Sequence, residues 1–139
     1  MIKNKHSLIV SIFCLLLFAC KKSALEDCDC QKMTVWSIDC DILFPVNITK
    51  ENITNSPKKE ITNKRTQDSI IKAILKLTPI EHGDGIDNRF LIRIQCKNSK
   101  TIDIESNCSL TMVDQKYYKT SEDLVRLVEQ NLINPDSEE

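Results

Sequence analysis

The sequence predicts an α+β domain in which a small antiparallel sheet of about four strands carries two helices on one face. Three observations lead to this fold class. Four segments alternate apolar and polar residues with a period of two, two others repeat apolar residues at helical spacing, and short polar turns separate the later strands. The expected order is β-α-β-β-β-α, and the short turns favour antiparallel pairing. With 139 residues, the chain has the length of one domain.

The first expected strand covers residues 34–42 and is followed by a long polar stretch. Its inward positions are even-numbered: Thr34, Trp36, Ile38, Cys40 and Ile42. Phe44-Pro45 ends the strand. The polar composition of residues 46–65 predicts a loop, and an irregular edge strand within it is the alternative. The first helix begins at Thr66, whose side-chain oxygen can cap it, and ends before Pro79. Its apolar stripe contains Ile70, Ile71, Ile74, Leu75 and Leu77.

Three further strands and a second helix follow. Even-numbered residues again take the inward phase: Phe90, Ile92, Ile94, Cys96, Ile102, Ile104, Cys108, Leu110 and Met112. Asn98-Ser99 and Asp114-Gln115 are expected turns. The second helix is capped by Ser121 and ends at Pro135. Its buried face contains Leu124, Val125, Leu127, Val128 and Leu132.

Composition and charge exclude several classes of protein. The 19 basic and 20 acidic side chains give a formal charge of −1, which lacks the basic footprint of a nucleic-acid-binding domain. Two glycines are too few for a phosphate loop that needs three. We therefore predict no cofactor and no nucleic-acid partner.

The first twenty residues carry a targeting signal. Basic residues precede an apolar run over residues 8–18, which is too short to span a bilayer and has the length of a signal-peptide core. The run ends in Leu17-Phe18-Ala19-Cys20, which resembles the lipobox of bacterial lipoproteins. The resemblance implies cleavage after Ala19, transfer of diacylglycerol to the Cys20 thiol, and anchoring by two or three acyl chains such as palmitate.

This resemblance sets the expected domain organisation. Residues 1–19 are the signal peptide, 20–32 a lipidated tether, 33–134 a single α+β domain and 135–139 an acidic tail. It implies a protein held to a membrane of the bacterial cell envelope by its lipid anchor. Lys21, in place of an aspartate after the lipidated cysteine, favours the outer membrane over the inner one. The Ile-, Lys- and Asn-rich composition resembles that of small envelope lipoproteins of Bacteroidota.

Five cysteines follow the expected tether start, at positions 28, 30, 40, 96 and 108. Cys40, Cys96 and Cys108 lie on the inward phase of expected strands, which suits either small buried apolar side chains or a sheet-spanning disulfide in an oxidising compartment. Because five is odd, complete pairing within the chain is impossible. Cys28 or Cys30 can pair inward or with a second molecule.

His82 lies in an expected surface loop that also holds both glycines. A zinc site would join His82 with Cys28, Cys30 and Cys40, but the single residue between the first two cysteines departs from the usual spacing, so no metal site is predicted. The loop also contains candidate ligands for a hard cation: Glu81, Asp84, Asp87 and Asn88. Its glycines equally suit a plain connection. A pair of His82 with a strand cysteine as nucleophile conflicts with the apolar setting of those strands.

Two function classes remain after this survey. The favoured class is a lipid-anchored, non-catalytic binding or accessory lipoprotein of the cell envelope, with an envelope protein as partner and no catalytic residue. The alternative is a small envelope hydrolase whose site no motif reveals. A cleft that gathers His82 with carboxylates favours the hydrolase, whereas an exposed apolar patch or an open sheet edge favours binding. A basic group in the polar loop suits a solvated face or an acidic partner: Lys58, Lys59, Lys64 and Arg65.

Overall fold

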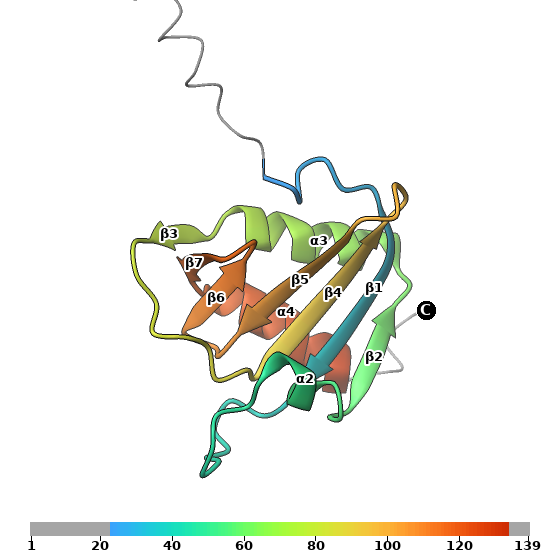
Figure 1. Ribbon diagram of the computed structural model, residues 1–139. Coiled ribbons are helices and arrows are strands. Elements are labelled where there is room, and N and C mark those ends of the chain that lie inside the picture. Colours follow the sequence, from blue (N-terminus) through green and yellow to red (C-terminus); the bar gives the residue numbers. More distant parts are fainter. Residues whose placement is uncertain (1–22, 134–139) are drawn as a thin grey trace, which may run out of the picture.

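The computed structural model describes residues 23–133, which form one antiparallel sheet packed against helices (Figure 1). The strand order is β2-β1-β4-β5-β6-β7-β3, and every neighbouring pair is antiparallel. The strands are β1 (Cys30–Ser37), β2 (Lys58–Ile61), β3 (Thr78–Ile80), β4 (Phe90–Cys96), β5 (Thr101–Ser106), β6 (Leu110–Val113) and β7 (Lys116–Lys119). The helices within the described range are α2 (Lys50–Ile53), α3 (Lys64–Leu75) and α4 (Glu122–Ile133).

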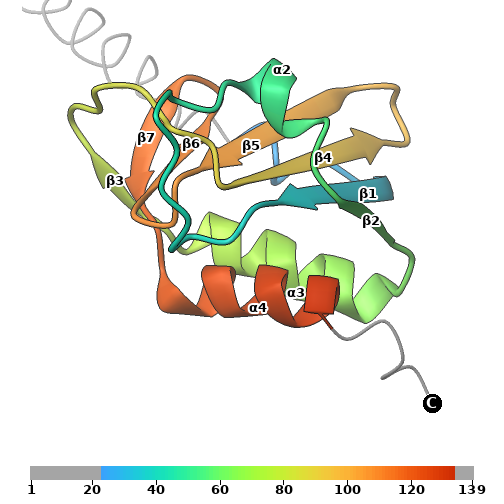
Figure 2. The same ribbon diagram turned by 90° about the horizontal axis from the view of Figure 1, so that it is seen from below.

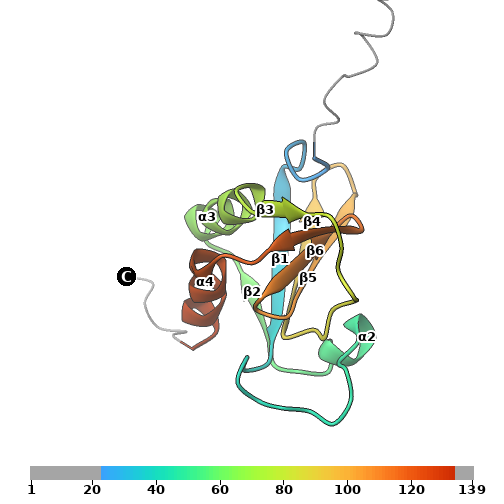
Figure 3. The same ribbon diagram turned by 90° about the vertical axis from the view of Figure 1, so that its left-hand side faces the viewer.

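The helices divide between the two faces of the sheet. The long helices α3 and α4 lie side by side on one face, whereas α2 lies on the other (Figures 2 and 3). The main core fills the space between the sheet and the two long helices. A smaller second core lies on the α2 side and consists of Trp36, Ile48, Ile53 and Leu91. The strands β1 and β4 are therefore covered on both faces.

The predicted fold class is confirmed in its coarse form. The domain is mixed α and β with an antiparallel sheet, and two helices share one face as expected. The estimate of about four strands is wrong, because the sheet has seven, and the order of elements differs as well. The elements missing from the prediction, namely α2, β2, β3 and β7, have three or four residues each. Segments this short do not complete a recognisable apolar period.

The central hairpin of β4 and β5 has the predicted inward phase. Ile92 lies opposite Ile104, and Ile94 lies opposite Ile102. All four side chains are at most 2% exposed in the main core. The alternation could be recognised in the sequence because the residues on the outer face of β5 are polar.

The predicted phase is wrong for β1. This strand begins at Cys30, four residues before the expected start, and ends at Ser37. Met33 and Val35 enter the main core, whereas Trp36 enters the second core on the opposite face. Because α2 covers that face, apolar residues are favourable on both sides of the strand, and alternation no longer identifies the inner one.

The predicted phase is also wrong for β6, in which Thr111 and Val113 are buried in place of Leu110 and Met112. Ser106 pairs with Thr111 across the preceding turn, and residues 107–110 intervene. An even number of intervening residues places an even-numbered residue opposite an odd-numbered one, so the inward parity changes at this turn.

The polar stretch 46–65 contains ordered elements in place of the predicted loop. In α2, the Thr49 hydroxyl caps the helix by accepting a hydrogen bond from the Asn52 N–H at 3.3 Å, and Ile53 is fully buried. The edge strand β2 pairs with β1 and places Ile61 opposite Met33. The irregular edge strand that the sequence left open is therefore β2.

Both long helices match the prediction except at the start of α3. Its cap is Asn63, whose Oδ1 accepts from the Thr66 N–H at 3.1 Å, so the cap lies three residues before the expected cap Thr66. Leu75, expected in its buried stripe, is 42% exposed. Pro79 lies after the helix in β3, at an edge of the sheet where its missing N–H is tolerated.

Folded structure extends beyond the predicted boundary at residue 33. Leu25 is 2% exposed in the main core, and Cys28 is bonded to Cys96 on β4. Leu25 and Cys28 therefore pack as part of the domain, although the sequence assigned both residues to the tether.

Several sequence predictions lie outside the described residues. These are the signal peptide 1–19 with its cleavage site at Ala19, the lipidation site Cys20, and the acidic tail 135–139. Between residues 23 and 133, no helix combines the length and the apolar character that crossing a bilayer requires.

Candidate functional site

The distal loop, which we define as residues 38–48, leaves the sheet where β1 ends. It lies at the end of the sheet opposite to the one at which the chain enters the domain (Figure 1). Five consecutive exposed apolar residues occupy its middle: Ile42, Leu43, Phe44, Pro45 and Val46. Leu43 is 92% exposed and Val46 is 71% exposed. Single exposed leucines are common on protein surfaces, but a contiguous apolar patch of this kind indicates an interaction site.

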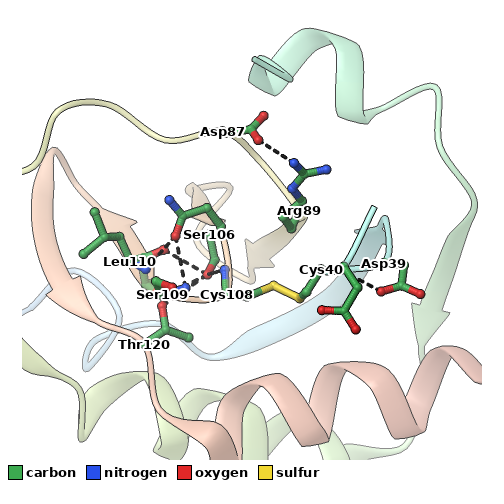
Figure 4. Close-up of a disulfide and its surroundings, with 12 residues drawn as sticks. Asp39, Cys40, Asp87, Arg89, Ser106, Cys108, Ser109, Leu110 and Thr120 are labelled. Atoms are coloured by element: carbon green, nitrogen blue, oxygen red, sulfur yellow. Dashed lines mark hydrogen bonds and ion pairs between the residues drawn. A yellow bond between two sulfur atoms is a disulfide. The ribbon is translucent and has the colours of Figure 1, made fainter. Parts of the chain in front are cut away.

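A disulfide fixes the first part of the distal loop. Cys40 is bonded to Cys108 in the turn between β5 and β6, with the two Cα atoms 6.3 Å apart (Figure 4). Cys108 has a φ of 69°, a left-handed conformation that costs a residue with a side chain roughly 1–2 kcal/mol. Asn107 stabilises this turn, because its Oδ1 accepts hydrogen bonds from the N–H groups of Ser109 at 3.0 Å and Leu110 at 2.7 Å.

The far end of the distal loop is held by residues that precede β4. The Ile48 N–H donates to Asp87 Oδ1 at 2.6 Å, and the Ile48 carbonyl accepts from the Asn88 N–H at 2.8 Å. Asp87 also pairs with the buried Arg89 at 2.6 Å, which neutralises the guanidinium (Figure 4). The Phe44 ring lies over this guanidinium, with Cζ 5.1 Å from the ring centroid. The loop is thus fixed at its start, its middle and its end.

A cleft of about 770 Å³ adjoins the distal loop, between α4 and the neighbouring ends of β1 and β2. Its apolar lining residues are Ile38, Pro57, Phe90, Val125, Val128 and Leu132. Its charged lining residues are Asp39, Asp41, Lys58, Lys59 and Glu129. A second cleft of about 330 Å³ shares residues 39–41 with the first. A concave apolar surface of this size accommodates a small ligand or the side chains of a protein partner.

An ion-pair network connects α2 to the α2-side face of the sheet. Asp103 accepts from Arg93 Nε at 2.8 Å and from Arg93 Nη2 at 2.9 Å, and it pairs with Lys50 at 2.7 Å. Burial by itself raises the pKa of Asp103, but the two cations outweigh burial and lower this pKa below its ordinary value. A carboxylate held in its charged form at neutral pH stabilises structure and is a poor general acid.

Three buried hydroxyl groups form a cluster next to the Cys40–Cys108 disulfide. Thr111 Oγ1 lies 2.8 Å from Thr120 Oγ1 and 3.2 Å from Ser106 Oγ. Within the described part of the chain, their remaining hydrogen bonds go to the backbone of the turn and include none to a histidine or a carboxylate. A hydroxyl without an adjacent base is a weak nucleophile, so this cluster stabilises the turn.

The three cysteines that the sequence placed on strands all form disulfides. Cys40 is bonded to Cys108, and Cys96 is bonded to Cys28 with the two Cα atoms 5.3 Å apart. The interpretation as free apolar side chains is therefore wrong for these three, and the free, buried thiol is instead Cys30, which the sequence placed in the tether. The zinc site and the Cys–His pair are also wrong for this state, because the thiolates they require are in disulfides.

The candidate residues of the His82 loop do not converge. His82 is exposed and lines neither cleft, while Glu81 and Asp84 point to solvent. Asp87 and Asn88 instead hold the distal loop. No group of three histidine, cysteine, aspartate or glutamate side chains suited to a metal occurs in the range 23–133.

The four basic residues of the polar stretch do not form one patch. Lys58 and Lys59 lie on β2 beside the end of β1 and line the large cleft. Lys64 and Arg65 begin α3 close to the start of β1, and Lys64 pairs with Asp68 at 3.1 Å. The two pairs of basic residues therefore lie near opposite ends of the sheet.

Sequence reasoning missed the distal loop, because it treated Ile42 as the last inward residue of a strand. The usable signal was the uninterrupted apolar run 42–46 between Asp41 and Asn47, since an alternating strand breaks such a run with polar residues.

The chain was also compared with known proteins: no family model matches it, and neither a curated protein nor a solved structure is similar to it.

Proposed function

We propose that this protein is a lipid-anchored, non-catalytic binding module of the bacterial cell envelope, and that its distal loop engages another envelope protein. The observation that carries the proposal is the exposed apolar run 42–46 on a loop that is held at Cys40, Phe44 and Ile48. A fixed loop loses little conformational entropy on binding. Its apolar side chains gain about 25 cal/mol for each Å² that they bury. The two disulfides suit a compartment outside the reducing cytosol.

The position of the distal loop supports a protein partner over a lipid surface. Residues 20–22 extend to at most about 10 Å, so a lipid on Cys20 keeps the entry end of the sheet close to the headgroups. From that end β1 runs away for eight residues, a distance of about 26 Å. The distal loop then faces away from the membrane that holds the anchor. The hydrolase alternative requires His82 beside carboxylates in a cleft, and His82 lies outside both described clefts.

The first test concerns the anchor. Radiolabelled palmitate is expected to enter the wild-type protein and to be absent from a Cys20→Ser variant, because only the Cys20 thiol can accept the first lipid. Both proteins are immunoprecipitated from labelled cells and compared by autoradiography at matched amounts. Equal labelling of the two proteins contradicts a lipid anchor at Cys20.

The second test concerns the binding surface. A photoreactive amino acid placed at Leu43 is expected to form a discrete crosslinked species with another protein in intact cells. A Val46→Asp change in the same protein is expected to lower that yield at least tenfold, because burying an unpaired charge in an apolar contact costs more than about 1.4 kcal/mol. Val46 is 71% exposed, so its replacement leaves the folded domain intact.

The matched control for this test is Leu75, an exposed leucine on α3 outside the distal loop. Photoreactive substitution there is expected to give no discrete species. Equal crosslinking from both positions, or a yield at position 43 that Val46→Asp leaves unchanged, contradicts the distal loop as the binding surface.

A further inference from the structure

Cys30 carries a free thiol close to the Cys28–Cys96 disulfide, at the end of the sheet where the chain enters the domain. Cys30 is the direct partner of Cys96 in the antiparallel pairing of β1 with β4. Residues directly opposite in such a pair have Cα atoms about 4.5–5.5 Å apart, which lies within the range that a disulfide spans. Cys28 already bonds Cys96 across 5.3 Å. Cys96 is therefore within bonding reach of two cysteines at once.

The side chains of the three cysteines also lie in the same part of the main core. Cys30 and Cys96 are both buried members of the main core, and Cys28 packs against the same cluster. The backbone between Cys28 and Cys30 is hydrogen-bonded to the residue after β4, because the Asp29 carbonyl accepts from the Lys97 N–H at 2.9 Å. An irregularity in the β1–β4 register follows directly after Cys30, a feature that re-aims side chains in a strand.

We propose that Cys28, Cys30 and Cys96 form a thiol–disulfide exchange site with two alternative disulfides. In the exchange, the Cys30 thiolate attacks the Cys96 sulfur, a Cys30–Cys96 bond forms and the Cys28–Cys96 bond breaks. Cys28 leaves as a thiolate and takes up the proton that Cys30 lost. The number of disulfides is unchanged, so the step needs no external oxidant or reductant.

The exchange moves the free thiol from the core to the surface. Cys30 is 5% exposed, whereas Cys28 is half-buried in the turn through which the chain enters the domain. Burial raises the pKa of the Cys30 thiol and shields it from other molecules, so the isomer with Cys28–Cys96 reacts only within the chain. The isomer with Cys30–Cys96 presents a thiol that can attack a disulfide of another molecule. Nothing in this exchange depends on a lipid anchor or on the distal loop.

The test traps the exposed thiol in the native full-length protein. Wild-type protein in detergent is incubated with N-ethylmaleimide at neutral pH, quenched with acid, digested with pepsin and mapped by mass spectrometry. The expected product carries the label on Cys28 and a Cys30–Cys96 disulfide. A label on Cys30 with Cys28–Cys96 intact overturns the proposal, as does protein that remains unlabelled after prolonged incubation.

Two variants make the assignment specific. Cys30→Ser removes the attacking thiol, and labelling of Cys28 is expected to be lost. Cys28→Ser removes the leaving group, and the isolated protein is expected to contain the Cys30–Cys96 disulfide. Two free thiols at positions 30 and 96 in that variant also overturn the proposal. The Cys40–Cys108 disulfide is mapped in every sample as a control against general reshuffling of the disulfides.

Discussion

A Cys40→Ser/Cys108→Ser variant is expected to lose about 3–4 kcal/mol of its free energy of unfolding. The bonded residues are separated by 68 positions, and closing a loop of that length restricts the unfolded chain by slightly more than 4 kcal/mol. The remaining Cys28–Cys96 bond already shortens the path between them to roughly 25 residues, which lowers the expected loss. Urea unfolding of both proteins in oxidising buffer measures the difference.

The same experiment in excess reductant is the control. With all disulfides reduced, wild type and variant differ only by two oxygen-for-sulfur replacements, and their free energies of unfolding are expected to agree within about 1 kcal/mol. A difference that persists under reduction would assign the effect to the serine side chains. Equal stability of the two proteins in oxidising buffer would contradict a stabilising role for this bond.

An Ile104→Ala variant is expected to lose about 3–4 kcal/mol of its free energy of unfolding. Ile104 is fully buried and lies opposite Ile92, which is also fully buried. Truncation removes apolar contacts and leaves a cavity that the flanking strands cannot close, and such changes cost about 2–5 kcal/mol. Chemical denaturation followed by tryptophan fluorescence measures the loss, since Trp36 belongs to the second core.

Thr101→Ala is the matched control, because Thr101 is exposed on the same strand. Its replacement is expected to change stability by less than about 0.5 kcal/mol. Asp103→Ser is expected to cost about 1–3 kcal/mol, more than an exposed polar residue, because it removes the partner of Arg93 and Lys50. A larger loss for Thr101→Ala than for Ile104→Ala would contradict the inward phase of β5.

Alternation predicted the fold correctly where one face of a strand is polar, and it failed elsewhere for physical reasons. Ile92 and Ile104 were assigned to the core because polar residues separate the isoleucines within β4 and within β5. Trp36 was assigned to the wrong face, because α2 covers the outer side of β1 and the sequence does not show which apolar set faces the long helices. Thr111 was missed because the change of parity depends on the length of a turn that contains no glycine.

The candidate site was less accessible from sequence than the fold. Apolar loop residues such as Leu43 resemble the end of a strand until the structure shows that no element covers them. The pairing of the cysteines could not be predicted either, since Cys28 bonds Cys96 although Cys30 is the residue directly opposite Cys96 in the sheet. Asp87 was assigned to a candidate cation loop, although its contact with Ile48 joins segments 39 residues apart.

The two disulfides interleave along the chain, which has a consequence for biogenesis. Each joins residues 68 positions apart, and the first residue of each bond precedes both partners. In a chain that is exported N-terminus first, Cys28, Cys30 and Cys40 reach an oxidase before Cys96 and Cys108 have emerged. Bonds formed in order of arrival therefore join the wrong cysteines, and the four bonded cysteines alone allow three pairings. For a chain exported in this way, we expect correct pairing to require an isomerase, or an internal thiol, that reshuffles early bonds after the whole sheet has crossed.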